Sequence, residues 1–173
     1  QVPVILRILD ERAPANIIAY YRREFAILHD LSSSRVVRPC SIINVPHRII
    51  FETIDCGEHA CSAASLVGSL SLDDFLTFAI EIARAARDMH AEGITHAALS
   101  PKSILYIPKT QEIFLKDFGV AFRKRDDTPA ALDNRILTYV LPYVSPELTG
   151  RINRHADHRS DLYSLGAILY ELA

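Results

Sequence analysis

The spacing of apolar residues changes along this chain, and that change restricts the fold more than any other feature. Residues 2–9 and 41–56 alternate in polarity and are rich in β-branched side chains, which predicts a strand and a hairpin. Residues 14–31, between them, repeat apolar side chains at helical spacing. The rest of the chain is mainly helical in pattern. Strands around one helix, followed by a mainly helical part, predict an α+β fold with two lobes that meet near residues 54–66.

The second half of the chain predicts a helix, a hairpin, a loop and a second helix in that order. Residues 71–90 begin with the helix-capping pattern Ser-Leu-Asp-Asp and predict a long helix. Two short strands are expected within residues 103–116, and the apolar residues 161–172 predict a buried helix. Residues 120–150 are polar and weakly periodic, so we expect a long loop there, and long loops in compact domains are usually functional.

Composition places the chain among ordinary globular proteins and excludes several classes of function. It has 173 residues, of which 49% are hydrophobic and 23% charged, and a formal net charge of −2. The lack of a basic excess argues against nucleic acid or an anionic membrane as a partner. No apolar run reaches the roughly 20 residues that span a bilayer, so we expect no membrane insertion. Three cysteines without CxxC spacing fit reduced thiols in a cytoplasmic protein.

Four short motifs in the second half belong together. Residues 94–105 read ITHAALSPKSIL, and residues 115–122 read LKDFGVAF. Residues 145–147 read SPE, and residues 160–166 read SDLYSLG. In this order they resemble the catalytic loop, the DFG motif, the APE motif and the buried-helix motif of eukaryotic-type protein kinases. The resemblance covers essentially the whole chain and implies a two-lobed protein kinase-like fold.

Residues 145–166 indicate which group of kinase-like domains this chain resembles most. Their sequence, SPELTGRINRHADHRSDLYSLG, is most similar to the N-terminal kinase-like domain of large hybrid histidine kinases of fungi and bacteria. This similarity implies a signal-transduction protein of the two-component type. The partners that it implies are other proteins or other domains of the same polypeptide.

The resemblance also implies a partial domain over residues 1–173, with a small-lobe part over 1–56 and a large-lobe part over 57–173. The large-lobe part would run through the buried helix that starts near Asp161. The glycine-rich loop and the late large-lobe helices would be absent, and with them the arginine that pairs in the family with the position of Glu147. Because an unpaired buried carboxylate costs several kcal/mol, we expect these residues alone to be poorly stable.

The resemblance implies that the catalytic base is lost. In the family, an aspartate of the catalytic loop accepts or orients the proton of the substrate hydroxyl, and Ala98 stands at its position. Loss of a positioned base removes roughly 10²- to 10⁴-fold of rate. Ala97 stands where the family has an arginine that receives a loop phosphate. Phosphorylation of Thr128 or Thr138, in the long loop, would therefore lack its usual receptor.

The phosphate-clamping position of the small lobe is changed as well. Arg7 matches the strand lysine that holds the α- and β-phosphates, and Glu24 matches the helix glutamate that pairs with it. No lysine precedes Lys102, so a different alignment supplies no lysine. Arginine can still pair with Glu24, but at a phosphate clamp it is not a conservative replacement.

Three further positions of the family pattern differ. Ser100 matches the lysine of the catalytic loop, Ser103 matches the second metal ligand, and Val140 matches the threonine that links base and lysine. A serine hydroxyl at 103 would be a weak ligand for Mg²⁺. Lys102 offers an alternative, in which its side chain swings in to replace Ser100. So many changes together predict a site without an intact catalytic residue.

Asp117 keeps the family's metal-binding identity, and two interpretations of it stay open. It could bind Mg²⁺ on a nucleotide, or the motif could persist for structural reasons, because Phe118 packs between the lobes and Gly119 permits an unusual backbone angle. His96 is expected to be a core histidine bonded to backbone. Asp161 is expected to cap backbone amides of the catalytic loop from inside the core.

The leading hypothesis is a pseudokinase that regulates or binds other parts of a signalling protein. One alternative is a weak or atypical serine/threonine kinase that uses Lys102 and Asp117. Another is a nucleotide-binding sensor without phosphotransfer. ATP with Mg²⁺ would bind weakly or not at all, and its adenine would lie against Ile54, Asp55 and Cys56, as the resemblance implies.

Overall fold

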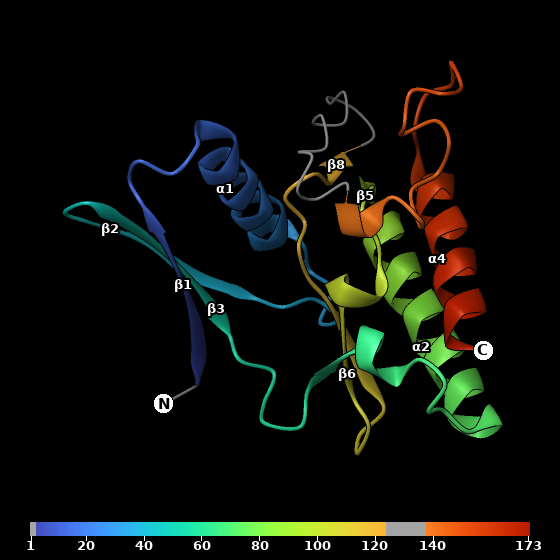
Figure 1. Ribbon diagram of the computed structural model, residues 1–173. Helices are drawn as coiled ribbons and strands as arrows, with labels where there is room; N and C mark the ends of the chain where they lie inside the picture. Colours follow the sequence, from blue (N-terminus) through green and yellow to red (C-terminus); the bar gives the residue numbers. More distant parts are fainter. Residues whose placement is uncertain (1–2, 124–137) are drawn as a thin grey trace.

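The computed structural model describes residues 3–123 and 138–173 and contains two parts (Figure 1). The N-terminal part is a three-stranded sheet with one helix. The C-terminal part is built on two long helices with small sheets beside them. This arrangement confirms the α+β, two-lobed architecture that the sequence predicts.

The sheet of the N-terminal part has the strand order β1-β3-β2 and is antiparallel throughout. β1 (Val4–Asp10) pairs with β3 (Arg48–Ile54), and β3 pairs with β2 (Pro39–Val45). His47, in the tight turn between β2 and β3, has a positive φ of 64°. The two strands therefore form the hairpin that the alternating pattern predicts.

α1 (Ala15–Asp30) packs against this sheet through aromatic side chains. The ring of Tyr21 lies 5.4 Å from the ring of Phe51 on β3. The buried residues of α1 are Glu24, Ile27 and Leu28, whose spacing of three and four places them on one face of the helix. That face includes a carboxylate, so α1 carries an ionisable group into the interior.

Two long helices, α2 (Leu72–Ala91) and α4 (His158–Leu172), lie side by side in the C-terminal part (Figure 1). The Ser71 hydroxyl accepts a hydrogen bond from the backbone N–H of Asp74 at 3.2 Å, so the predicted cap of α2 is present. α4 begins at His158, before the predicted start at residue 161, because the Asp157 carboxylate caps it by accepting the Arg159 N–H at 2.9 Å. Within the described residues, no helix combines the length and hydropathy needed to cross a membrane.

Short strands complete the C-terminal part. One sheet has the order β4-β6-β7 and comprises β4 (Cys61–Ser62), β6 (Ile104–Ile107) and β7 (Glu112–Leu115). A second pair joins β5 (Ile94–Thr95) to β8 (Phe122–Arg123). The β6–β7 pair is the hairpin predicted within residues 103–116.

The region predicted as a long loop, residues 120–150, is described in part. It contains β8 and a helical turn over residues 138–140, in which Thr138 is exposed. Thr128, the other candidate phosphorylation site, lies outside the described residues.

Residues 35–37 connect the two parts through hydrogen bonds and ion pairs. The Val37 N–H donates to the Leu115 carbonyl, and the Leu115 N–H donates to the Arg35 carbonyl, both at 2.9 Å. The guanidinium of Arg35 lies 3.0 Å from the carboxylates of Glu81 and Asp88 on α2. These bonds join the segment between α1 and β2 to β7 and α2.

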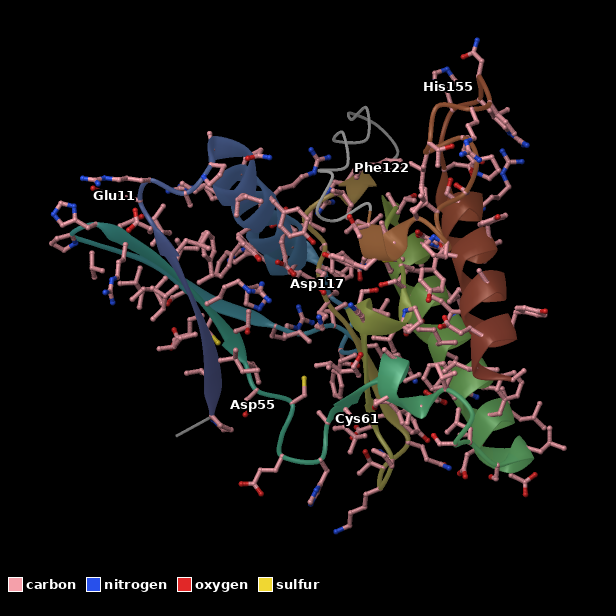
Figure 2. The ribbon with its side chains drawn as sticks, in the orientation of Figure 1. Glu11, Asp55, Cys61, Asp117, Phe122 and His155 are labelled. Atoms are coloured by element: carbon pink, nitrogen blue, oxygen red, sulfur yellow. The ribbon has the colours of Figure 1, made fainter. Side chains whose placement is uncertain are left out.

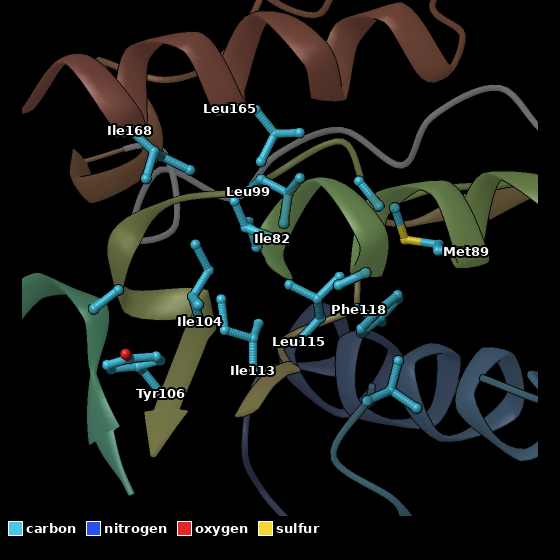
Figure 3. Packing of buried hydrophobic residues seen from close by; sticks show 14 of the residues in the cluster. Ile82, Met89, Leu99, Ile104, Tyr106, Ile113, Leu115, Phe118, Leu165 and Ile168 are labelled. Atoms are coloured by element: carbon cyan, nitrogen blue, oxygen red, sulfur yellow. The ribbon is translucent and has the colours of Figure 1, made fainter. Parts of the chain in front are cut away.

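The main hydrophobic core lies between α2, α4, the β6–β7 hairpin and the end of α1 (Figure 3). Phe118 and His96 meet inside this core, with ring centroids 4.5 Å apart. A second, smaller core, here called the loop cluster, surrounds the segment that contains the predicted catalytic position. The loop cluster consists of Ala97, Ala98, Val120, Phe122, Val140 and Val144.

Candidate functional site

Asp117 lies where α1 approaches the C-terminal part (Figure 2). The Glu24 carboxylate of α1 accepts hydrogen bonds from the backbone N–H of Asp117 at 2.8 Å and of Phe118 at 3.2 Å. The Tyr20 hydroxyl donates to the Asp117 carbonyl at 3.2 Å. The helix therefore holds the backbone of the DFG turn directly.

Burial changes the protonation of Glu24. Glu24 is buried, with 8% of its surface exposed. Burial, and after it the charge of Asp117, raise the pKa of Glu24 to about 7, against the opposing influence of Arg7 and the two backbone N–H donors. A carboxyl group with this pKa is partly protonated at neutral pH. The negative charge that faces Arg7 and Asp117 therefore depends on pH.

Two cations contact the Asp117 carboxylate. Nζ of Lys116 lies 2.5 Å from Oδ2, and a guanidinium nitrogen of Arg7 lies 3.9 Å from Oδ1. Asp117 has a φ of 68°, in the left-handed region that is strained for residues other than glycine. The bond from its N–H to Glu24 helps to hold this conformation.

Arg7 reaches the site from β1. Its guanidinium lies 3.6 Å from the Glu24 carboxylate, so the contact expected between these two residues is present. It also lies over the Tyr21 ring, 4.6 Å from the ring centroid, where a cation is attracted to the aromatic face. The Arg7 side chain is 40% exposed and thus remains accessible from solvent.

Asp161 holds the loop that contains Ala97 and Ala98. Its fully buried carboxylate accepts the backbone N–H groups of His96 and Ala97, each at 2.9 Å, and lies 2.8 Å from Nε2 of His90. The predicted capping role of Asp161 is confirmed. Ala97 has a φ of 66°, so these bonds stabilise a loop conformation that is strained for alanine.

His96 is a buried core residue, as predicted. Its Nε2 lies 2.9 Å from the Lys116 carbonyl, and its Nδ1 lies 3.3 Å from the Ala98 backbone nitrogen. Because a carbonyl only accepts, Nε2 carries the hydrogen and Nδ1 accepts from the Ala98 N–H. Burial lowers the pKa of His96, which favours this neutral form. Both ring nitrogens are therefore used by backbone.

Ala98 and Val140 pack in the loop cluster defined above. Ala98 is 5% exposed and Val140 is 1% exposed. The resemblance assigns these two positions to the base and the threonine of the family pattern, and here both side chains are apolar and share one cluster. The apolar side chains of this cluster would remove water from a carboxylate at position 98 without donating a hydrogen bond to it.

Ser103 is used by the turn that it forms with Ser100. Its hydroxyl accepts the Ser100 N–H and donates to the Ser100 carbonyl, both at 2.9 Å, and both residues are buried. The donor and one acceptor site of Ser103 are thus occupied within the turn. The ammonium of Lys102 lies 5.2 Å from the centroid of the Tyr139 ring. Replacement of Ser100 by Lys102 stays a prediction.

The donor set does not suit Mg²⁺, whereas its charges suit phosphate. Mg²⁺ needs oxygen ligands in near-octahedral geometry, but the Asp117 carboxylate is paired with two cations and the Ser103 hydroxyl is engaged in its turn. Among the described residues, no three or more His, Cys, Asp or Glu side chains are arranged to hold a metal ion. Arg7 and Lys116, in contrast, are groups that bind phosphate oxygens.

The residues predicted to contact adenine lie at the end of β3 and in the turn after it. The Ile54 N–H donates to the Arg38 carbonyl at 2.8 Å, and Cys56 follows in the turn. Both residues are partly exposed, and burial raises the pKa of the Cys56 thiol. Their role in binding adenine stays a prediction.

The reason predicted for Gly119 is wrong. The unusual backbone angle belongs to Asp117, and the structural need at Gly119 is space. A Cβ atom at position 119 would lie 2.3 Å from Cδ2 of the Tyr20 ring, far inside van der Waals contact. Glycine is required because the Tyr20 ring on α1 packs directly against the DFG turn.

The expectation of an unpaired, buried Glu147 is also wrong. Glu147 is only partly buried, and its carboxylate accepts a hydrogen bond from the Ser160 hydroxyl at 2.7 Å. Although burial opposes ionisation, this bond and others hold the pKa of Glu147 below its ordinary value. The proposed cause of poor stability is therefore removed, and the stability of residues 1–173 stays a prediction.

Three contacting residues were not predicted from the sequence. Tyr20 and Arg23 accompany Glu24 on α1, and the Arg23 guanidinium donates to the Ala121 carbonyl at 2.8 Å. Lys116 directly precedes Asp117, so its place in the sequence could have indicated the contact. The other two could be found only by knowing how α1 packs.

The site combines a carboxylate on a helix, a cation on a strand and an Asp-Phe-Gly turn between two lobes. This combination defines a kinase-like domain. A family model described as the protein kinase domain matches residues 4–173. The chain belongs to this family.

The relatives of this chain include proteins named as serine/threonine kinases and one named as a histidine kinase. Serine/threonine-protein kinase pkn2 of Myxococcus xanthus is 28% identical over 178 residues, which is 94% of this chain and 20% of the relative. Serine/threonine-protein kinase PknA of Mycobacterium tuberculosis is 31% identical over 123 residues, 71% of this chain and 27% of the relative. Histidine protein kinase 1 of Candida albicans is 31% identical over 107 residues, 60% of this chain and 4% of the relative. The chain thus spans about a quarter or less of these proteins.

Proposed function

We propose that this domain is a pseudokinase, a regulatory or interaction module of a multi-domain signal-transduction protein that does not transfer phosphate. The observation that carries this proposal is the place of Ala98 in the loop cluster with Val140. A general base must lie within hydrogen-bond reach of the substrate hydroxyl. The neighbouring His96 is not a substitute, because it is buried and bonded to backbone on both nitrogens.

The partners in this proposal are other domains of the same polypeptide or separate proteins of the same pathway, in the cytoplasm. The match to the Candida histidine protein kinase supports this view, since the matched segment is a small part of that protein. We place the division between the lobes at residues 56 and 57.

A weak or atypical serine/threonine kinase is the second candidate. Asp117 and the contact between Arg7 and Glu24 persist, and two of the relatives above are named serine/threonine-protein kinases. In this candidate, Lys102 and Asp117 take part in the reaction. A nucleotide sensor without phosphotransfer is the third candidate, supported by the cations Arg7 and Lys116 beside Asp117.

Phosphotransfer separates the atypical kinase from the other two candidates. The polypeptide that contains residues 1–173 is incubated with γ-labelled ATP, Mg²⁺ and a general protein substrate, as wild type and as the Asp117→Asn and Ala98→Asp variants. The pseudokinase proposal predicts that the wild type incorporates no more label than Asp117→Asn. Incorporation that needs Asp117 and increases in Ala98→Asp would establish the atypical kinase instead.

A further inference from the structure

A lysine side chain contacts the carboxylate that would ligate a divalent cation. Nζ of Lys116 lies 2.5 Å from Oδ2 of Asp117, and the ammonium donates a charge-assisted hydrogen bond to the carboxylate. At the second metal-ligand position, the Ser103 hydroxyl is hydrogen-bonded to the backbone of Ser100. Both sides of a metal site are therefore already engaged by the protein.

We propose that Lys116 replaces Mg²⁺ as the counter-ion of Asp117, so that Lys116 and Arg7 bind the phosphate groups of a nucleotide without a divalent cation. This inference rests on the proposed function, because it concerns the same site and its nucleotide-binding candidate. It adds the independence of nucleotide binding from metal and the residue responsible for it.

The charges around Asp117 suit the binding of an anion. An ammonium group has three N–H donors, of which Asp117 takes one, so Lys116 retains donors for phosphate oxygens. Arg7 approaches the other oxygen of the same carboxylate and is 40% exposed. Two cations thus flank one carboxylate, and the second nearby carboxylate, Glu24, is buried and bonded to backbone N–H groups.

A divalent ion at the Asp117 carboxylate would lie close to the Lys116 ammonium, which contacts Oδ2. Because Lys116 is the neighbouring residue, its ammonium would remain near the metal and repel it. Mg²⁺ also lowers the negative charge of ATP in solution. We therefore expect free ATP to bind at least as tightly as its magnesium complex.

The test measures ATP binding to the polypeptide that contains residues 1–173, by titration calorimetry, with EDTA or with excess MgCl₂. Lys116→Met removes the ammonium, and its backbone carbonyl still accepts from His96. Lys109→Met, at the exposed turn after β6, is the matched control. Adenosine and tripolyphosphate are titrated separately to show which part of the ligand is bound, and thermal unfolding without ligand confirms that both variants fold.

The expected result is ATP binding in EDTA that is equal to or tighter than in MgCl₂. Lys116→Met should weaken it at least about tenfold, as loss of a charge-assisted hydrogen bond does, while Lys109→Met leaves it unchanged. Binding that requires Mg²⁺, binding that Lys116→Met leaves intact, or no ATP binding at all overturns the inference. An absence of ATP binding leaves the pseudokinase proposal standing, whereas phosphotransfer that needs Mg²⁺ and Asp117 overturns both.

Discussion

Substitution of Ala98 by aspartate tests whether the surroundings of this position, and not only the missing carboxylate, prevent catalysis. Ala98 is 5% exposed and belongs to the loop cluster. A polar group buried without a hydrogen bond costs about 1–3 kcal/mol by protein mutational data, and the new carboxyl group is expected to have a raised pKa. We therefore expect Ala98→Asp to lower the free energy of unfolding by about 2 kcal/mol and to yield no phosphotransfer.

A second substitution supplies the missing partner. Val140→Thr, added to Ala98→Asp, places a hydroxyl in the same cluster and should recover about 1 kcal/mol. The control is Ala64→Asp at an exposed position, which should change stability by no more than about 0.5 kcal/mol. Since the chain has no tryptophan, unfolding is followed by circular dichroism.

A loss of 2 kcal/mol corresponds to a fall in melting temperature of about 4–8 °C for a chain of this size. The reasoning is refuted if Ala98→Asp melts at the same temperature as the Ala64→Asp control. It is also refuted if the single variant transfers phosphate at a rate above wild type.

Three further substitutions test the contacts of α1 and the loop. Because the pKa of Glu24 is raised from 4.5 to about 7, its contribution to stability is present below about pH 4.5 and is lost as pH rises through 7. In urea unfolding, the free energy of unfolding of the wild type should therefore fall by about 3 kcal/mol as pH rises from about 4.5 to 7, relative to that of Glu24→Gln. If the unfolding free energies of the two proteins change in parallel with pH, the raised pKa of Glu24 is contradicted. Gly119→Ala should lower stability by about 1–3 kcal/mol in thermal unfolding, and Tyr20→Ala in the same chain should relieve the clash; an unaffected single variant would exclude the close packing. Asp161→Asn should cost about 2 kcal/mol or more, because His96 and Ala97 donate to different oxygens of Asp161 and the amide NH₂ would replace one of these acceptors. A wild-type melting temperature would contradict the capping role.

The regular elements could be predicted from the sequence because each depends on local periodicity. The β2–β3 hairpin, α1 and α2 follow from alternation, helical spacing and the Ser71 cap. α4 begins three residues before the start that its apolar pattern predicts, because the pattern begins at Asp161 while the helix is capped by Asp157. Caps outside the apolar stripe are invisible to a search for periodicity.

The candidate site could be predicted only in part. Arg7 contacts Glu24, as the resemblance implies, and both lie beside Asp117. Tyr20, Arg23 and Lys116 complete the site and were not predicted. The shared cluster of Ala98 and Val140 could not be predicted, because it depends on how distant segments pack. The same holds for Gly119, whose neighbour Tyr20 is contributed by a helix far away in sequence.

The most direct test of the central claim is the single-turnover rate of phosphate transfer from ATP to a protein hydroxyl by the polypeptide that contains residues 1–173. Protein kinases typically turn over at about 1–100 s⁻¹. The loss of a positioned base predicts a rate at least about 10²- to 10⁴-fold lower, and indistinguishable from that of Asp117→Asn. A rate in the ordinary range that falls in Asp117→Asn would contradict the account.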